Sequence, residues 1–378
     1  MAGIYIHIPF CKKICFYCDF YRELHTGSTD EFVSAVLREA EIRKNYLGDE
    51  EISTIYIGGG TPSVLSCRDL GKIINGISRL FRINEKCETT IEINPDDLND
   101  EYIKGLVETG FNRMSLGIQS WRDEDLKLLN RRHDAKQAEN ALFLLLNNGI
   151  SNISIDLIYG IPGMSVADWE KNLDITFSFD IKHLSAYHLT IEPGTVFGRM
   201  KKEGHFREIE EEESVNQYNM LVEKAQGKDF IHYEISNFGR KGFFSEHNTN
   251  YWRQVNYIGL GPSAHSFNQY SRQWNVRNIK TYISKVNENS SFFEKEELTV
   301  KTRFNEYVMT ALRTMWGINL DYIESTFEKE GYDYVVNLSQ RFRDYGLMVL
   351  EGNNLQLTNQ GKMISDNIIS EFMMADND

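Results

Sequence analysis

The sequence has no long hydrophobic run and no recognisable export signal. No stretch of about 18 apolar residues occurs, although a membrane-spanning helix needs about 20. The first residues, Met1 to Ile4, run directly into an apolar segment without a cationic start or a signal core. We therefore expect no transmembrane segment and a cytoplasmic protein.

Positive charge is also scarce. The 378 residues contain 41 Lys and Arg against 55 Asp and Glu, which gives a net charge of −14. No basic cluster occurs that would neutralise a run of phosphates, so nucleic acid is not an expected partner. With 41% hydrophobic and 12% aromatic residues, the chain has enough apolar material for one large domain and at least one smaller one.

Cysteine is rare, with 5 residues, but three of them lie together as Cys11, Cys15 and Cys18. Such clustering suits a reducing compartment, where thiolates bind metal. Zinc normally takes four N or S ligands, and the other cysteines, Cys67 and Cys87, lie far away in the sequence. A 4Fe-4S cluster held by three cysteines instead leaves one iron free to chelate the amine and carboxylate of S-adenosylmethionine (SAM).

The spacing within this loop is specific. The pattern C-x3-C-x2-C, with Tyr17 directly before the last cysteine, is similar to the radical-SAM signature. Two other interpretations stay open from the residues alone. One is a redox-inert loop, and the other is a zinc knuckle completed by a histidine such as His7 or His25.

Segments with strand periodicity alternate with segments of helical period along the first half of the chain. Six such alternations, with right-handed crossovers, predict an α/β protein whose parallel sheet curls toward a barrel. The expected strands are 4–8, 52–57, 89–93, 113–118, 153–159 and 183–189. The expected helices are 30–47, with Thr29 as its cap, 68–81, 101–108, 135–146 and 166–176.

Polar and glycine residues gather at the predicted carboxyl ends of these strands, where barrels of this kind place their reacting groups. The run Gly58 to Gly60 lets backbone approach a ligand. Glu92 offers an acceptor for a hydroxyl or amino group, and Arg131 offers a fork for a carboxylate. Gln119 and Asp156 also lie at or near such ends. Taken singly, each has a plain alternative: a simple turn, or a carboxylate satisfied in the core.

The region after the sixth strand is rich in aromatic residues and histidine. Its surfaces suit a flat aromatic ligand, and histidine is a common axial ligand of haem iron. In the alternative interpretation His247 caps a helix, while Tyr251 and Trp252 pack the floor of the barrel. His265, which follows the glycine-rich run 259–262, competes with His247 as the axial ligand.

The last part of the chain follows a polar joint at 287–291. Its pattern predicts helix, helix, helix, a hairpin around Gly352 and Asn353, and a final helix, which is a winged-helix-like arrangement. It lacks the basic helix of a DNA reader, so we expect a packing or lid domain. The expected helices are 303–315, 320–327 and 334–345, the hairpin strands 348–351 and 354–358, and the domains 1–200, 201–295 and 296–378.

Four strings, at 5–18, 58–62, 112–120 and 156–163, closely resemble the HemN/HemW family of radical-SAM proteins, and the match extends over nearly the whole chain. The resemblance implies a partial (β/α)6 radical-SAM barrel with a C-terminal helical domain. It also implies Cys11, Cys15 and Cys18 as ligands of a 4Fe-4S cluster. The SAM-site residues that it implies are Tyr5, Tyr17, Gly59, Gly60, Thr61, Glu92, Gln119, Arg131 and Asp156.

Two activities occur in this family. HemN-type oxidases typically carry a further cysteine two positions after the third and a long N-terminal extension, whereas this chain has Phe20 there and four residues before Tyr5. HemW-like haem chaperones carry the motif H-N-x-x-Y-W, which occurs here at 247–252. The resemblance therefore implies a haem chaperone that binds haem through His247, takes electrons from a reductant and delivers haem to acceptor proteins. An oxygen-independent coproporphyrinogen III oxidase is the alternative, an enzyme for another substrate is a third, and a homodimer stays open.

Overall fold

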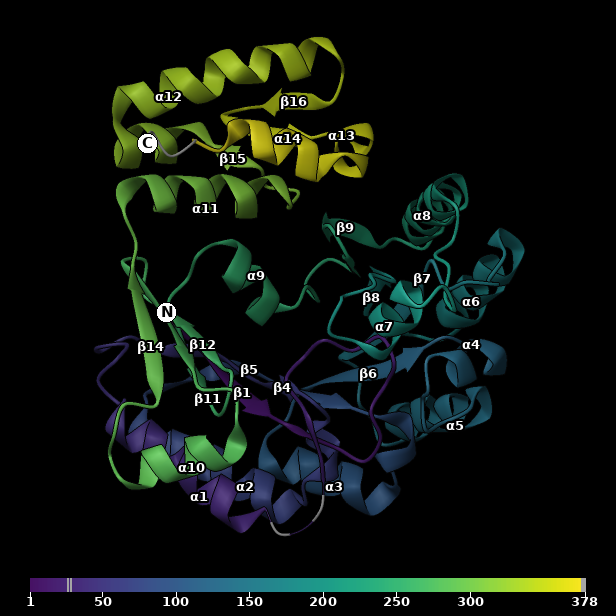
Figure 1. Cartoon of the computed structure of the whole chain (residues 1–378), viewed down its shortest axis with the longest axis vertical. Coiled ribbons are helices and arrows are strands. Elements are labelled where there is room, and N and C mark those ends of the chain that lie inside the picture. The colour runs from purple at the N-terminus through teal and green to yellow at the C-terminus, as the bar shows by residue number, and fades with distance from the viewer. Residues whose placement is uncertain (26, 28, 375–378) are drawn as a thin grey trace.

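The computed structural model describes residues 1–25, 27 and 29–374. Most of the described chain forms a curved α/β unit around one 12-stranded sheet, and a smaller unit stacks at one end of it (Figure 1). The sheet order is β14-β13-β12-β11-β1-β4-β5-β6-β7-β8-β10-β9. Helices α1, α2, α3 and α10 lie at the opposite end from the smaller unit (Figure 1).

The six predicted strands and the five predicted helices are confirmed. The strands lie side by side and parallel, which gives the predicted partial barrel. They are β1 (Ala2–Ile8), β4 (Ile52–Gly59), β5 (Ile83–Ile93), β6 (Arg113–Gln119), β7 (Ile153–Tyr159) and β8 (His183–His188). The helices are α1 (Asp30–Ile42), α2 (Cys67–Leu80), α3 (Asp100–Thr109), α5 (Ala135–Asn147) and α6 (Val166–Ser178).

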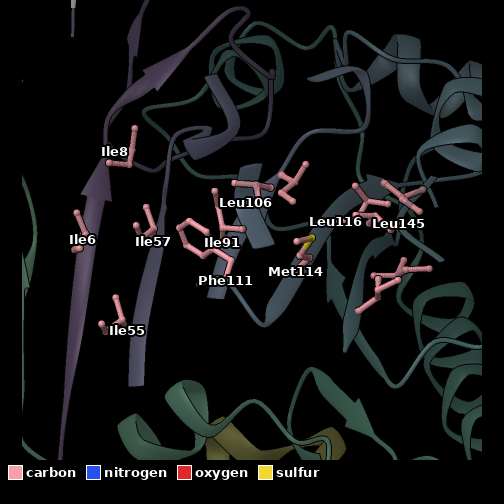
Figure 2. Close-up of a cluster of buried hydrophobic side chains, with 14 of the residues drawn as sticks. Ile6, Ile8, Ile55, Ile57, Ile91, Leu106, Phe111, Met114, Leu116 and Leu145 are labelled. Atoms are coloured by element: carbon pink, nitrogen blue, oxygen red, sulfur yellow. The ribbon is translucent and has the colours of Figure 1, made fainter. Parts of the chain in front are cut away.

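The two faces of this sheet differ because side chains alternate along each strand. Apolar side chains such as Ile57, Ile91 and Leu116 face outward and pack under the helices, as Leu106 and Leu145 show (Figure 2). The alternate positions are polar and point into the barrel. The interior therefore offers hydrogen-bonding groups rather than a filled apolar core.

Helix ends follow the expected capping chemistry in most places. Ser66 caps α2 by accepting from the Asp69 N–H, and Asp134 begins α5 with a capping box. Thr29 precedes α1, but its side chain makes no cap hydrogen bond and instead donates to Asp69 Oδ2 at 2.9 Å. Helix α1 ends at Ile42, five residues earlier than the prediction of 47, and turns follow it.

Sequence reasoning missed the strands that extend the sheet at both edges. Strand β11 lies parallel to β1, and β12, β13 and β14 continue antiparallel from it, while β10 and β9 lie antiparallel beyond β8. These strands have three to five residues each, which is too short for a clear alternation. They are β9 (Ile231–Glu234), β10 (Asn237–Gly239), β11 (Tyr257–Leu260), β12 (His265–Phe267), β13 (Ser271–Asn275) and β14 (Phe293–Glu297).

The smaller C-terminal unit has its own apolar core, which runs from Phe304 to Phe372. The predicted hairpin is confirmed, with β16 (Met348–Glu351) antiparallel to β17 (Asn354–Leu357). The two predicted helices 320–327 and 334–345 lie within α12 (Leu320–Asp344), whose backbone is non-helical at Phe327 and Glu328, so the predicted break after 327 is confirmed. Other elements of this unit are α11 (Val300–Leu312), β15 (Ile318–Asn319), α13 (Asn359–Met363) and α14 (Ser365–Phe372). The domain division at 200 and 295 stays a prediction.

The remaining elements connect these layers. They are β2 (Phe10–Cys11), β3 (Glu23–Leu24), α4 (Asp123–Leu128), α7 (Val196–Lys202), α8 (Glu211–Gln226), α9 (Glu246–Trp252), α10 (Ile279–Asn287) and the single 3-10 turns Pro62–Val64 and Pro95–Asp97. Helix α9 lies between the sheet and α11 of the C-terminal unit (Figure 1). Within the described residues, no helix is both long and apolar enough to cross a bilayer.

Candidate functional site

The three clustered cysteines line one cavity of about 420 Å³ at the carboxyl ends of the parallel strands. Strand β2 pairs with β3 and so closes the loop that carries Cys15 and Cys18. None of the three forms a disulfide, and the Cys18 N–H lies 3.4 Å from the Cys15 carbonyl. Burial raises the pKa of Cys11 and raises the pKa of Cys18 to about 11, so metal binding at this loop must displace thiol protons.

A zinc knuckle completed by His7 is not what the structure forms. Both ring nitrogens of His7 are occupied, Nε2 by the Tyr21 carbonyl at 2.9 Å and Nδ1 by the Tyr5 hydroxyl at 3.1 Å. Among the described residues, no group of three or more His, Cys, Asp or Glu side chains is arranged to hold a single metal ion. The His25 ring packs edge-on against Phe10.

The glycine run at the end of β4 seats the cysteine loop. A Cβ at Gly60 would lie 2.8 Å from the Phe10 carbonyl oxygen and 3.0 Å from that of Ile8. Gly59 has φ +111°, which strongly favours glycine. Gly60 thus allows close approach of backbone to backbone. Gly59 and Gly60 also line the cavity, and their approach to a ligand stays a prediction. The next residue, Thr61, donates to the Cys11 sulfur at 3.4 Å.

Glu92, on β5, is held within the barrel by two donors. The Tyr56 hydroxyl donates to its Oε1 at 2.9 Å, and the Gly59 N–H donates to its Oε2 at 3.0 Å. Burial, with a smaller contribution from the nearby Asp156, raises the pKa of Glu92 to about 7. The carboxyl group is therefore positioned at the cavity wall and gains a proton near neutral pH.

This pKa predicts a pH-dependent effect of Glu92→Gln. The folded state holds the Glu92 proton more tightly than the unfolded state, whose pKa is 4.5. The resulting stability is fully present below about pH 4.5 and is lost as the pH rises through about 7. As the pH rises from about 4.5 to about 7, the free energy of unfolding of the parent should therefore fall by about 2 to 3 kcal/mol relative to that of the glutamine variant. Urea unfolding of the cluster-free proteins across pH 4.5 to 8 measures this, and parallel pH profiles would contradict it.

Arg131 connects the cysteine loop to the strand ends. Its Nη1 lies 3.4 Å from the Cys15 sulfur, and its Nη2 donates to the Gly117 carbonyl at 2.7 Å and to Asn94 Oδ1. Its Nε is buried and has no hydrogen-bond partner. Since an unpaired buried donor is costly, this atom indicates that a polar ligand belongs in the cavity. Tyr17 lines the same cavity, and burial raises the pKa of its hydroxyl.

Gln119 and Asp156 complete this wall from β6 and β7. The Ser115 hydroxyl lies 3.1 and 3.2 Å from the two carboxylate oxygens of Asp156, and burial raises the pKa of Asp156. Gln119 ends β6 with φ +71°, which is uncommon for a residue with a Cβ. The structure therefore brings together at one cavity the three cysteines and every predicted SAM-site residue except Tyr5.

Tyr5 and His247 lie behind the cavity wall and do not line it. The Tyr5 ring centroid is 6.2 Å from that of Tyr56, and the His247 ring stacks on Tyr56 at 5.0 Å. Both nitrogens of His247 are occupied, Nδ1 by the Thr54 hydroxyl at 2.7 Å and Nε2 by the Tyr251 hydroxyl at 2.9 Å. Only 2% of His247 is exposed, and burial lowers its pKa to about 3.

In this conformation, then, His247 serves packing and has no nitrogen open to iron. It does not cap a helix, because Ser245 caps α9 by accepting from the Asn248 N–H. The prediction of His247 as an axial ligand requires both of its hydrogen bonds to break. His265, the competing candidate, is exposed, and among the described residues no group bonds to its ring nitrogens.

A second cavity, of about 510 Å³, lies between α9, the edge strands and α11. The motif residues Tyr251 and Trp252 line it, so they do more than pack the barrel floor. Tyr187 and Asn248 line both cavities, which are therefore neighbours. The wall combines aromatic and apolar side chains, such as Tyr257, Phe267 and Met309, with polar and charged ones, such as Glu234 and Arg272.

Sequence reasoning missed a set of polar side chains inside the barrel. His183 on β8 bonds the Ser154 hydroxyl at 2.7 Å through Nδ1 and the Tyr233 hydroxyl at 2.7 Å through Nε2. Arg113 and Ser185 line the first cavity beside them. The sequence signal that could have found the strand residues among them is that polar residues occupy every second position of a predicted strand, as His183 and Ser185 do.

The donor set fits a 4Fe-4S cluster with SAM. Three thiols line one cavity, the buried Nε of Arg131 has no partner within the protein, and Glu92 and Asp156 offer acceptors. A bound cluster supplies electrons and one iron with a free position for SAM. Cys11, Cys15 and Cys18 would hold it. Arg131 lies against the Cys15 sulfur and donates to the Gly117 carbonyl at the end of β6.

Comparisons with known proteins show which proteins this chain resembles in sequence and in fold. The sequence model of the Radical SAM superfamily matches residues 5–175. The chain is 31% identical to the heme chaperone HemW of Bacillus subtilis over 376 residues, 99% of each chain. It is 31% identical to the heme chaperone HemW of Lactococcus lactis over 377 residues, 98% of this chain and 97% of that one. The Escherichia coli coproporphyrinogen III oxidase HemN has the same fold, with a TM-score of 0.85 at 21% identity over 99% of this chain and 90% of that one.

The fold and the three-cysteine site together define a radical-SAM protein, a class that implies a 4Fe-4S cluster and SAM as cofactors. The likeness to HemN shows the fold alone at this identity. Within the class, the full-length similarity is decisive: the chain belongs to the HemW family.

Proposed function

We propose that this protein is a haem chaperone that binds a 4Fe-4S cluster, SAM and haem, and delivers the haem to acceptor proteins. The observation that carries the proposal is the second cavity, a chamber beside the cluster cavity with five aromatic side chains in its wall, among them Tyr251 and Trp252 of the H-N-x-x-Y-W motif. Relatives that match the whole chain carry the name heme chaperone. A flat, largely apolar ring suits such a lining.

The haem ligand is proposed from the histidines near this chamber. His247 lies in the motif but has both ring nitrogens engaged. His265 lies two residues before Phe267 on β12, so the two share a face of the sheet, and Phe267 lines the chamber. Its exposed ring lies 6.4 Å, centroid to centroid, from that of Trp274. We therefore propose His265 as the axial ligand and His247 as support for Tyr251.

Two alanine variants separate these roles. His265→Ala should shift or abolish the Soret band of the haem complex, because the iron loses its axial nitrogen. His247→Ala should keep the band position while lowering stability, since it removes two hydrogen bonds and a ring stack. Absorption titration with haem and thermal unfolding measure both effects. An unchanged spectrum in His265→Ala together with a lost band in His247→Ala would return the ligand to the motif histidine.

A further inference from the structure

Strands β12 and β13 share a face, and one end of it, with Phe267 and Arg272, lines the second cavity. His265 pairs with Trp274 and Phe267 pairs with Arg272 across the two strands, so these four side chains share a face. The opposite face is closed, since Arg43 bonds Ser266 at 2.8 Å and Gln273 at 3.0 Å beneath it. The face with Phe267 and Arg272 is thus the wall of the cavity.

Among the described residues, Arg272 is the basic member of a lining that is otherwise aromatic, apolar, polar or acidic. Its Nη2 lies 2.7 Å from Oε1 of Glu306 on α11, and this pair joins the sheet to the C-terminal unit. The side chain of Arg272 is 34% exposed, whereas that of Glu306 is 13% exposed. A guanidinium has five donors, so this single ion pair leaves donors available at the cavity wall.

We propose that Arg272 binds a carboxylate of a large planar ligand seated in this cavity, and that the carboxylate of Glu306 competes with the ligand for the guanidinium. The proposal rests on the proposed function, because haem is a planar ring that carries two carboxylates. An arginine fork matches carboxylate geometry, and the aromatic lining takes the ring. Arg272 thereby favours a ring that carries a carboxylate over an uncharged ring of the same shape.

The carboxylate of Glu306 should weaken the binding of a ligand carboxylate by Arg272. It lies against the same guanidinium that would receive the ligand, so two negative charges approach one positive charge. Removal of the Glu306 charge should strengthen the preference for a carboxylate. This expectation gives the proposal a second, independent variant.

The test compares haem with its dimethyl ester, in which both carboxylates are blocked, by titration of the cluster-loaded protein. The parent should bind haem about ten-fold or more tightly than the ester, the size expected for hydrogen bonds to a charged group. Arg272→Gln should lose most of that preference while its affinity for the ester changes little. Arg253→Gln is the matched control, because Arg253 stacks on Trp316 and does not line the cavity.

Glu306→Gln should bind haem with a preference over the ester that exceeds that of the parent. Equal preference in the parent and in Arg272→Gln would overturn the proposal, as would a smaller preference in Glu306→Gln than in the parent. If the parent binds neither compound, the proposed function itself fails. If the parent binds haem and its dimethyl ester equally well, the proposed function holds and the proposed role of Arg272 is wrong.

Discussion

Replacement of Cys11, Cys15 and Cys18 together by alanine should abolish cluster incorporation. The three thiols are the sulfur donors that line the first cavity among the described residues, and Cys67 and Cys87 lie on other elements outside it. No other side chain there supplies the thiolates that iron-sulfur clusters require. The loss should be complete, because Thr61 and Arg131 contact the sulfurs of Cys11 and Cys15 and supply no sulfur of their own.

Iron and sulfide analysis after anaerobic reconstitution measures this effect, together with the broad visible absorption of the cluster. Cys67→Ala is the matched control, because its thiol packs between α2 and α3 and should leave the cluster content at the parent level. Full iron, sulfide and absorption in the triple variant would show that the cluster assignment is wrong.

Arg131→Met should weaken SAM binding by about 10-fold to 150-fold, which corresponds to 1.5 to 3 kcal/mol for a hydrogen bond to a charged group. The guanidinium is fixed at the Gly117 carbonyl, Asn94 and the Cys15 sulfur, and its buried Nε has no partner. Methionine fills a similar volume without any donor. The cluster itself should persist, because all three cysteines remain.

Calorimetric titration of the reconstituted variant with SAM measures the change, and iron analysis verifies the cluster. Arg122→Met is the control, since Arg122 pairs with Asp125 at 2.9 Å outside the cavity. If Arg131→Met and the parent bind SAM equally well, Arg131 has no part in the site.

The parallel part of the fold was predictable because its strands carry a strong local signal. Isoleucine or leucine at every second position, as at Ile55 and Ile57, defines a face for the helices to cover. The polar residues between them, such as Glu92 and Asp156, then had to point inward. The carboxyl ends of parallel strands meet at one edge, so the cluster loop and these residues were expected together.

The second cavity was not predictable in the same way. Its wall combines Tyr187 from β8, Trp252 from α9, Arg272 from β13 and Met309 from α11, which are far apart in sequence. The edge strands that carry part of it are too short to show a period. Only the three-dimensional arrangement brings Arg272 to Glu306.

His247 shows how a motif can indicate the right region without fixing a role. The motif predicted an aromatic ligand site, and three of its residues, Asn248, Tyr251 and Trp252, do line a cavity. The histidine itself lies inward, between Thr54 and Tyr251, because α9 turns that side of the helix toward β4. Sequence alone carries no information on which side of so short a helix faces the ligand.

The most direct test of the proposed function uses anaerobically reconstituted protein with its cluster loaded. One sample receives haem, and a second receives coproporphyrinogen III with SAM and a reductant. A haem chaperone should bind haem with a Soret band and form no protoporphyrinogen in the second sample. Formation of protoporphyrinogen without haem binding would contradict the proposed function and assign the protein to the oxidases.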